Sequence, residues 1–376
     1  MLVPISYNLR SLSRRRVRTG LTVGGIAAVV AVFVVMSSVS GTMKGMFKAT
    51  GQPDEVLVTQ PGALTPEFSF LPRPVATWLR TLGQIAVDAN GEPMVSPELT
   101  LSAKLEHRGQ RKAIALRGVS ATAKGVYREV RLLEGEWAGP GKKVMVGKQL
   151  ARAMGLKLGD ELALEKERWT TAGLFEAQGT LYEQEIWMDL DELGAASSRT
   201  DLTSILLRVK DASLTKSLVD ELGAQRRQPL QAMAAHDAYA RVGGMSMWMT
   251  SLGQFISLVI ALGAIFGGMN TMYSAVAGRM REIGILRALG YRSVAVMLSF
   301  LAESVLVGLT GGALGIVLAL AIGQAPLTMP YLVGNEVAIA SRAIVSGLVL
   351  AAAVGFLGGV LPAWQASRVK VVDVLR

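Results

Sequence analysis

Residues 21–40 read LTVGGIAAVVAVFVVMSSVS and lie in an uncharged run from Thr19 to Met43. A helix that crosses the hydrocarbon core of a bilayer needs about 20 mostly apolar residues. Three more windows meet this length, between Arg241 and Arg279, from after Arg292 to about Ile322, and between Arg342 and Arg368. The sequence therefore predicts an integral membrane protein with four transmembrane α-helices. A cleaved signal peptide is the alternative for the first window, but its run is longer than the usual apolar region of such a peptide, which favours a retained helix.

The composition excludes several classes of protein. Of 376 residues, 51% are hydrophobic and only 18% are charged, whereas soluble domains carry about 25% charged residues. The chain has no Cys, which excludes disulfide frameworks, thiol catalysis and cysteine-ligated zinc. Two His leave too few ligands for a histidine-rich metal site. No metal or cofactor is expected in this chain.

The net charge of +10 is concentrated in three short segments: residues 1–19 carry a net +5, residues 275–293 a net +3 and residues 367–376 a net +2. Each segment lies beside an apolar window, which is the pattern of cytoplasmic segments under the positive-inside rule. A nucleic-acid-binding surface would instead carry its charge on a folded face. Both termini are therefore expected in the cytoplasm, with Lys44–Arg241 outside and no nucleic acid as partner.

These windows and charges predict the layout of the chain. The expected order is a basic cytoplasmic N-terminus (1–19), a first transmembrane helix (20–43), an outer domain (44–245), a second helix (250–274), a cytoplasmic segment (275–293), a third helix (294–323), a short outer loop (324–341) containing Pro326 and Pro330, a fourth helix (342–366) and a cytoplasmic tail (367–376).

The region Lys44–Arg241 contains 26 Lys or Arg and 25 Asp or Glu, a balance typical of a soluble fold. Short strand-like runs dominate, including residues 99–106 and 112–118 around a turn, with a helix predicted over 74–85. The large inserted domain is therefore expected to be α+β. It has no glycine-rich phosphate loop and no spacing typical of a catalytic triad.

Every window contains a pair of glycines four residues apart, which permits close helix packing in lipid. The pairs are Gly20/Gly24, Gly263/Gly267, Gly311/Gly315 and Gly355/Gly359. Chance explains any single pair, but four of four predict tight packing, within one chain or between two. Glu303 is the one ionisable residue deep in a window. Such residues are functional candidates, but without a partner carboxylate, Lys or His in the other windows a structural role is favoured, paired with an Arg or capping a loop.

Between the second and third windows, Arg279–Gly290 reads RMREIGILRALG. Ile283, Leu286 and Leu289 recur at helical spacing, and Gly290 is suited to end a helix. A short amphipathic cytoplasmic helix is predicted. Periodicity alone leaves open whether it lies in the headgroup layer or docks into a partner protein.

REIGILRALG (281–290) resembles the segment shared by permeases of the MacB/FtsX-type (type VII) ABC transporters. NLRSLSRRRVRTGLTVGGIA (8–27) is similar to the family's entry into its first span, and LPAWQASRVKVVDVLR (361–376) to its C-terminal signature. VMVGKQLARAMGLKLGDEL (144–162) resembles the MacB-like periplasmic core domain, and Glu303 stands where the family usually has a Glu. The resemblance covers nearly the whole chain and is weaker in the part of the outer domain before about Pro93.

The resemblance implies a permease subunit in a bacterial inner membrane that is not itself an enzyme. The chain lacks GxxxxGK[ST], so ATP and Mg would be bound by a separate cytosolic ATPase, present in two copies. A second permease chain, identical or paralogous, would complete the transporter, with a periplasmic adaptor as a further candidate partner. The cytoplasmic helix would couple ATP hydrolysis to motion of the outer domain by mechanotransmission. The implied coupling residues are Arg279, Arg281, Glu282, Ile283, Leu286, Arg287, Leu289 and Gly290.

Two other functions stay open. A lipoprotein-releasing or cell-division permease shares the cytoplasmic motif, although the outer domain of roughly 200 residues is larger than division-type permeases carry. An envelope sensor, in which the outer domain detects a ligand and the ATPase reports it, is the candidate from a different class. An intramembrane hydrolase is set aside, because neither His lies in a window and there is no Cys.

Overall fold

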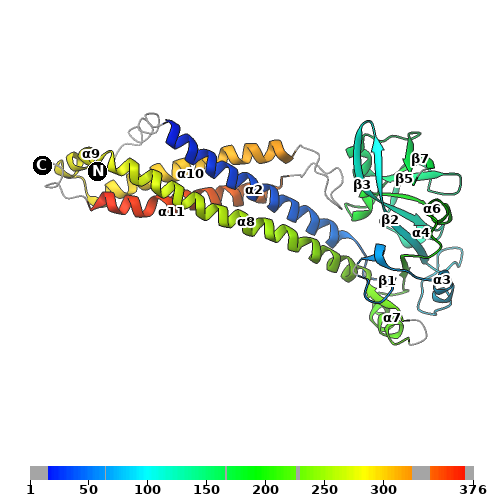
Figure 1. Ribbon diagram of the computed structural model, residues 1–376. Coiled ribbons are helices and arrows are strands. Elements are labelled where there is room, and N and C mark those ends of the chain that lie inside the picture. Colours follow the sequence, from blue (N-terminus) through cyan, green and yellow to red (C-terminus); the bar gives the residue numbers. More distant parts are fainter. Residues whose placement is uncertain (1–15, 64, 166, 226–228, 324–338, 369–376) are drawn as a thin grey trace. The chain divides into compact units, whose positions relative to one another are not determined.

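The computed structural model describes residues 16–63, 65–165, 167–225, 229–323 and 339–368. The described residues form two compact units, each treated separately below (Figure 1). The helical unit contains the residues up to Gly41 and those from Trp248 onward, and the sheet unit contains Thr42–Met247. Most of the basic N-terminus, nearly all of the outer loop with Pro326 and Pro330, and most of the C-terminal tail lie outside the described residues.

Long helices provide the four predicted spans. They are α2 (Arg16–Ala49), α8 (Ala235–Ala277), α10 (Ser293–Gly323) and α11 (Ser341–Ser367), with the short α9 (Met280–Ala288) between α8 and α10. The parts long and apolar enough to cross a bilayer are Thr19–Ala49, Ser251–Ala277, Ser293–Gly323 and Ser341–Ser367. The predicted architecture of four transmembrane helices with a large domain between the first and second is confirmed.

Glycines allow backbone-to-backbone contact between these helices. A methyl group added at Gly355 of α11 would lie 2.7 Å from the carbonyl oxygen of Ser304 in α10. One added at Gly315 of α10 would lie 2.5 Å from the carbonyl oxygen of Ala27 in α2. Such distances are far inside van der Waals contact, so no side chain fits at these positions without moving a backbone.

The predicted glycine pairs divide into two groups. Gly311 and Gly315 pack on α2, and Gly355 and Gly359 pack on α10. In contrast, a methyl group at any of the other members would have no neighbour within 4 Å in this chain; these are Gly20, Gly24, Gly263 and Gly267. The pairs of α10 and α11 therefore serve packing within the chain, whereas those of α2 and α8 are open on its surface.

The sheet unit contains one mixed ten-stranded sheet. Its strands are β1 (Glu55–Thr59), β2 (Val95–His107), β3 (Gln110–Val119), β4 (Arg131–Gly135), β5 (Lys143–Gly147), β6 (Glu161–Leu164), β7 (Glu167–Glu176), β8 (Glu185–Asp189), β9 (Ser204–Arg208) and β10 (Gln231–Ala234). Their order is β10-β1-β9-β2-β3-β8-β5-β7-β4, and β6 pairs with β7. Strands β3 and β8, and β5 and β7, run parallel; the other pairs are antiparallel.

Short helices lie between the strands along the chain. They are η2 (Pro66–Phe68), α3 (Arg73–Leu79), α4 (Ala123–Val126), α5 (Lys148–Met154), η3 (Leu181–Gln184), α6 (Leu190–Ser197) and α7 (Leu214–Gly223). Buried Leu, Ile and Val from the strands and from α3, α5, α6 and α7 form a single hydrophobic core. The predicted α+β character is present. The turn predicted around residues 108–109 joins β2 to β3 as a hairpin, and Arg108 and Gly109 adopt the positive φ angles that a two-residue turn requires.

The helix predicted over residues 74–85 is wrong at its C-terminal end. α3 stops at Leu79, and the following backbone joins the sheet instead of continuing the helix. Ile85 forms an antiparallel bridge with Val209, and the Ala86 N–H donates to the carbonyl oxygen of Arg208 at 2.8 Å. Tertiary hydrogen bonding therefore overrides the helical periodicity of this segment.

The two groups of glycines predict different sensitivities to substitution. Gly315→Ala and Gly355→Ala should each destabilise the helical unit by about 1–3 kcal/mol, because the added methyl group overpacks a backbone contact. Gly263→Ala, whose methyl group meets open space in this chain, is the matched control and should leave the stability of the single chain unchanged. Thermal unfolding of the detergent-solubilised chain measures this. Equal losses for all three variants would contradict the packing assignment.

Candidate functional site

The C-terminus of the short helix α9 is formed around Gly290. Gly290 has a φ of +90°, a conformation that side chains with a Cβ rarely adopt. Its N–H donates to the carbonyl oxygen of Arg287 at 3.1 Å, and the Tyr291 N–H donates to that of Leu286 at 3.2 Å. This pair of bonds is a Schellman motif, which satisfies two carbonyl groups at the helix C-terminus and turns the chain toward α10.

One face of α9 is fixed to the bundle. Ile283 is 1% exposed and belongs to a buried cluster with residues of α8, α10 and α11. The other members are Met272, Val276, Val296, Phe300, Ala363 and Ala366. Gly284 is also buried. The helix is therefore attached through its apolar side to three of the four long helices.

An ion pair holds the start of the same helix. Arg279, which precedes α9, places its Nη1 atom 3.1 Å from Oε2 of Glu303 in α10. The two side chains are 11% and 5% exposed, and the guanidinium lies 5.9 Å from the ring centre of Phe300. Glu303 thus pairs with an Arg, one of the two structural roles that the sequence allowed.

A small cavity adjoins this ion pair. It has a volume of about 40 Å³ and is lined by residues of α2, α8, α10 and α11, including Glu303 and Arg279. Thr22 of α2 and Thr271 of α8 also line it, with their hydroxyl oxygens 3.0 Å apart. Ser304 donates from its hydroxyl to the carbonyl oxygen of Gly355 at 2.6 Å. The polar groups of all four long helices therefore meet at one level of the bundle.

The opposite face of α9 is exposed. Arg281, Ile285 and Leu289 follow one another at four-residue spacing, and Ile285 and Leu289 are 50% and 72% exposed. Glu282 is exposed beside them, whereas Leu286 and Arg287 are half-buried. The structure thus divides the coupling residues expected from the sequence into two groups. Arg279 and Ile283 face the bundle, whereas the residues named above are exposed or half-buried. Ile285 was missed, although its spacing from Arg281 and Leu289 was readable.

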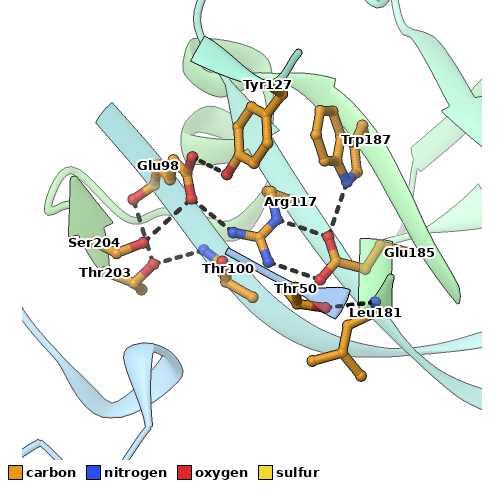
Figure 2. Close-up of polar contacts among 10 residues, drawn as sticks. All are labelled: Thr50, Glu98, Thr100, Arg117, Tyr127, Leu181, Glu185, Trp187, Thr203 and Ser204. Carbon is orange, nitrogen blue, oxygen red and sulfur yellow. Dashed lines mark hydrogen bonds and ion pairs between the residues drawn. The ribbon is translucent and has the colours of Figure 1, made fainter. Parts of the chain in front are cut away.

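In the sheet unit, the segment that follows α2 is tied to the sheet and to α8. The Thr50 hydroxyl oxygen accepts a hydrogen bond from the Leu181 N–H at 3.0 Å, as Figure 2 shows, and donates to the carbonyl oxygen of Met46 at 2.8 Å. Gly51 has a φ of +87°, and a methyl group there would lie 2.6 Å from the backbone nitrogen of His236 in α8. The end of α2 and the beginning of α8 are therefore in direct backbone contact.

Behind this junction lies a buried polar network (Figure 2). Arg117 of β3 donates to both carboxylate oxygens of Glu185 in β8, at 2.6 and 2.7 Å, and to Oε2 of Glu98 in β2 at 2.6 Å. Tyr127 donates to the other oxygen of Glu98, and Trp187 donates to Glu185 at 2.8 Å. Burial alone would lower the pKa of Arg117, but the carboxylates of Glu185 and Glu98 raise it well above its ordinary value. The network joins β2, β3 and β8, three neighbouring strands of the sheet.

A second buried cluster has an excess of acid. Arg208 of β9 donates to Asp54 at 2.6 Å, to Glu55, and to the carbonyl oxygen of Val126. Glu129 is 4% exposed, and neither of its carboxylate oxygens has a hydrogen-bond partner. Burial, assisted by the charge of Glu129, raises the pKa of Glu55 to about 8 against the pull of Arg208. Burial also raises the pKa of Glu129. Among the described residues, no group of three His, Asp or Glu is placed to bind a metal ion.

The comparison with protein families agrees with both units. The model of the MacB-like periplasmic core domain matches residues 19–225, more than half of the chain, and that of the FtsX-like permease C-terminal domain matches residues 254–371. The chain belongs to the MacB/FtsX-type permeases of ABC transporters. Its motif at 279–290 lies inside the FtsX-like match, and the Arg117 network lies inside the MacB-like match.

Individual relatives of this MacB/FtsX-type permease are MacB proteins. The macrolide export ATP-binding/permease protein MacB of Bordetella avium (strain 197N) is 28% identical over 398 residues, 98% of this chain and 59% of that protein. MacB 1 of Yersinia pestis bv. Antiqua (strain Antiqua) is 41% identical over 124 residues, 32% of this chain and 19% of that protein. The chain thus spans less than two thirds of the length of these curated relatives.

Among solved structures, the periplasmic region of MacB from Actinobacillus actinomycetemcomitans matches with a TM-score of 0.40 and 14% identity, covering 53% of this chain and 97% of that one. The extracellular domain of the noncanonic ABC-type transporter YknZ from Gram-positive bacteria matches with a TM-score of 0.37 and 14% identity, over 48% of this chain and 99% of that one.

The Arg279–Glu303 pair predicts how α9 is attached. Glu303→Ala removes the carboxylate that pairs with the buried Arg279, and loss of one partner of a buried ion pair typically costs about 3–5 kcal/mol, so α9 should detach more often. Because the chain has no Cys, Ile283→Cys reports this directly. Its labelling by a maleimide should be slow in the otherwise wild-type chain and at least tenfold faster with Glu303→Ala. Leu289→Cys, at an exposed position, is the control and should label rapidly in both. The double variant Arg279→Ala/Glu303→Ala should recover part of the protection; labelling of Ile283→Cys that ignores Glu303 would contradict this role.

The acidic cluster predicts an unusual pH dependence. Glu55 holds its proton more tightly in the folded state, with a pKa of about 8 against an ordinary 4.5. Its stabilising contribution is therefore complete below about pH 4.5 and is lost as the pH rises through 8, at ~1.4 kcal/mol for each unit of difference in pKa. Unfolding of the sheet unit, followed by fluorescence of the buried Trp169 and Trp187, should show stability falling from pH 5 to 8. Glu55→Gln should flatten this slope, whereas Glu176→Gln, at a carboxylate whose pKa is lowered by Lys148, should not. A wild-type stability that rises over this range would refute the assignment.

Proposed function

We propose that this chain is the transmembrane subunit of an ABC transporter in a bacterial inner membrane, and that a separate cytosolic ATPase docks on the exposed face of α9. ATP and Mg would be bound by that ATPase, and its closure would move the outer domain for export or extraction of a substrate. The observation that carries this proposal is the two-sided placement of α9: one side is buried in the bundle, and the other presents Arg281, Ile285 and Leu289 to solvent.

The inner side of α9 supports its use as a coupling element. Ile283 contacts residues of α8, α10 and α11, and Arg279 is paired with Glu303 inside the bundle. A partner that displaces α9 must therefore either displace these helices or separate a buried ion pair. Because breaking a buried ion pair is costly, movement of the helices is the favoured response.

The length of α2 and α8 supports transmission toward the outer domain. The two helices are continuous over 34 and 43 residues, about 50 and 65 Å at a rise of 1.5 Å per residue. The hydrocarbon core is only about 30 Å thick. Each helix therefore has turns beyond the core, and at the junction the Gly51 backbone contacts that of His236. We expect a displacement of either helix to be carried along that helix beyond the hydrocarbon core.

The topology and partners follow from the same scheme. The basic segments would face the cytoplasm, with both termini there and residues 44–245 in the periplasm. Two copies of the ATPase and a second permease chain would complete the transporter, and a periplasmic adaptor is a further candidate partner. The relatives are named for macrolide export, so a macrolide is the first substrate to test.

Co-purification with the ATPase encoded beside this chain tests the docking surface. Arg281→Glu combined with Leu289→Asp places two negative charges on the exposed face of α9, in place of a positive charge and an apolar side chain. This double variant should reduce ATPase recovery at least tenfold. Because both side chains are exposed, folding and membrane insertion should be unchanged. Arg368→Glu, the same charge reversal as Arg281→Glu at another predicted cytoplasmic position, is the matched control and should recover the ATPase normally.

Two results would overturn this proposal. A wild-type chain that recruits no ATPase would leave α9 as a membrane-surface helix. An ATPase that binds, and whose activity in lipid follows a ligand of the outer domain while no substrate moves, would favour the envelope sensor over the transporter. Release of lipoproteins in place of macrolides would keep the ATPase-driven scheme and change its substrate.

A further inference from the structure

An open groove of about 250 Å³ lies in the sheet unit, beside the edge strand β10. It is bounded by β1, β10, the first turns of α8 and the segment that follows β1. The lining residues that carry its chemistry are Leu57, Gln231, Met233, Tyr239, Arg241 and Val242. The groove is separate from α9 and from the cavity beside the Arg279–Glu303 pair.

The walls of this groove are held in place by hydrogen bonds. The Gly62 N–H donates to Oε1 of Gln231 at 3.1 Å, which ties the segment after β1 to β10. The Gln60 N–H donates to the Ser69 hydroxyl oxygen at 2.8 Å, and the Phe70 N–H donates to Oε1 of Gln60 at 3.2 Å. These bonds hold the segment after β1 against β10 and link its two ends, so the groove is formed before any ligand binds.

The groove rests on the buried aromatic core. The ring of Tyr239, a lining residue from the beginning of α8, is 6.0 Å from that of Tyr182 in an edge-to-face contact. Tyr182 in turn lies under the guanidinium of Arg117, 5.2 Å from the ring centre. Burial raises the pKa of Tyr239 above its ordinary value, so its hydroxyl stays protonated. The wall at Tyr239 is thus backed by the network of Figure 2.

The lining combines an apolar surface with donors and no acid. Leu57, Pro66, Met233, Ala238 and Val242 supply apolar contacts. The single charged lining residue is Arg241, which is exposed and makes no ion pair with any described residue. Gln231 uses its Oε1 for Gly62, and its Nε2 faces the Met233 sulfur at 3.8 Å, a weak acceptor. Arg241 therefore has no carboxylate partner among the described lining residues.

We propose that this groove binds a single-chain anionic amphiphile. The carboxylate or phosphate head accepts from Arg241 and the Gln231 amide, and the first part of the alkyl chain lies against Leu57, Met233 and Val242. A guanidinium binds such oxyanions by charge-assisted hydrogen bonds. At about 30 Å³ for each water of liquid, the volume takes roughly ten non-hydrogen atoms, so the groove holds the head and a short length of chain rather than a large ring. This binding does not depend on the proposed ATPase.

Photo-crosslinking on the full chain in phosphatidylcholine nanodiscs tests the proposal. The probe is a ten-carbon carboxylic acid with a terminal diazirine, and the matched probe is the amine of the same length. The carboxylate should label peptides that contain residues 57–66 or 231–242, and excess decanoate should compete. The amine should label them at least tenfold less. Equal labelling by both probes, or labelling confined to the membrane-spanning helices, would overturn the proposal.

Variants separate the head contact from the alkyl contact. Arg241→Gln, at an exposed side chain, should weaken carboxylate labelling about tenfold and remove the preference over the amine. Met233→Trp fills the groove and should reduce labelling by both probes. Arg168→Gln removes an exposed charge elsewhere in the sheet unit and should change nothing. Carboxylate labelling of Arg241→Gln equal to that of the wild type would refute the head contact.

The source of the anion is decided by lipid composition. Adding lysophosphatidylglycerol to the nanodiscs supplies a single-chain anionic lipid that competes for the same groove. Competition assigns the ligand to the membrane, and its absence assigns it to a free amphiphile; both keep the ligand class. The assay contains no ATPase, so failure of binding and failure of the proposed transporter are separate results.

Discussion

The helical unit depends on contact between backbones at glycine. A methyl group at Gly308 would lie 2.6 Å from the carbonyl oxygen of Ala351 and 2.9 Å from the Cα atom of Gly355. Lipid supplies no hydrophobic force between helices, so packing at this range and hydrogen bonds must hold α10 against α11. The same approach brings the Ser304 hydroxyl to the carbonyl oxygen of Gly355. Glu303, the next residue, is thereby placed inside the bundle, where it needs a cation.

Buried charges are balanced by opposite charges to different extents in three parts of this chain. In the bundle, Glu303 is balanced by Arg279. In the sheet unit, Arg117 is bonded by two carboxylates and supported by Tyr127 and Trp187, so its donors and acceptors are matched. Around Arg208 the matching fails, because Asp54 and Glu55 share its guanidinium while the buried Glu129 has no hydrogen-bond partner. A low-dielectric site with surplus acid takes up a proton rather than carry the charge.

Much of the architecture was predictable because it depends on local composition. The four spans follow from uncharged runs of membrane length, and the boundaries of α9 from a charged segment that ends in Gly290. Periodicity also grouped Ile283 with Leu289 on one apolar side, but it could not show which residues meet the bundle. Ile283 is buried and Leu289 is 72% exposed, because the direction from which α10 and α11 pack is a tertiary property.

The features that sequence reasoning missed join residues far apart in the chain. Arg117 meets Glu98 and Glu185 from different strands, and the Arg that pairs with Glu303 lies 24 positions away, at Arg279. No local pattern marks such partners, since Arg117, Glu98 and Glu185 each read as an ordinary surface charge. The 74–85 helix failed for a related reason, because the bridge between Ile85 and Val209 depends on a strand more than 100 residues later.

Tyr239 connects the proposed groove with the proposed mechanism. It belongs to the first turns of α8, lines the groove, and contacts Tyr182 of the buried core. The same helix continues to Ala277, two residues before the Arg that pairs with Glu303. If ATP-driven movement displaces α8, the wall formed by Tyr239 and Arg241 moves with it, and the affinity for the amphiphile changes. Linkage then requires the reverse effect of equal size, in which a bound amphiphile biases the position of α8 and thereby the binding of nucleotide by the ATPase.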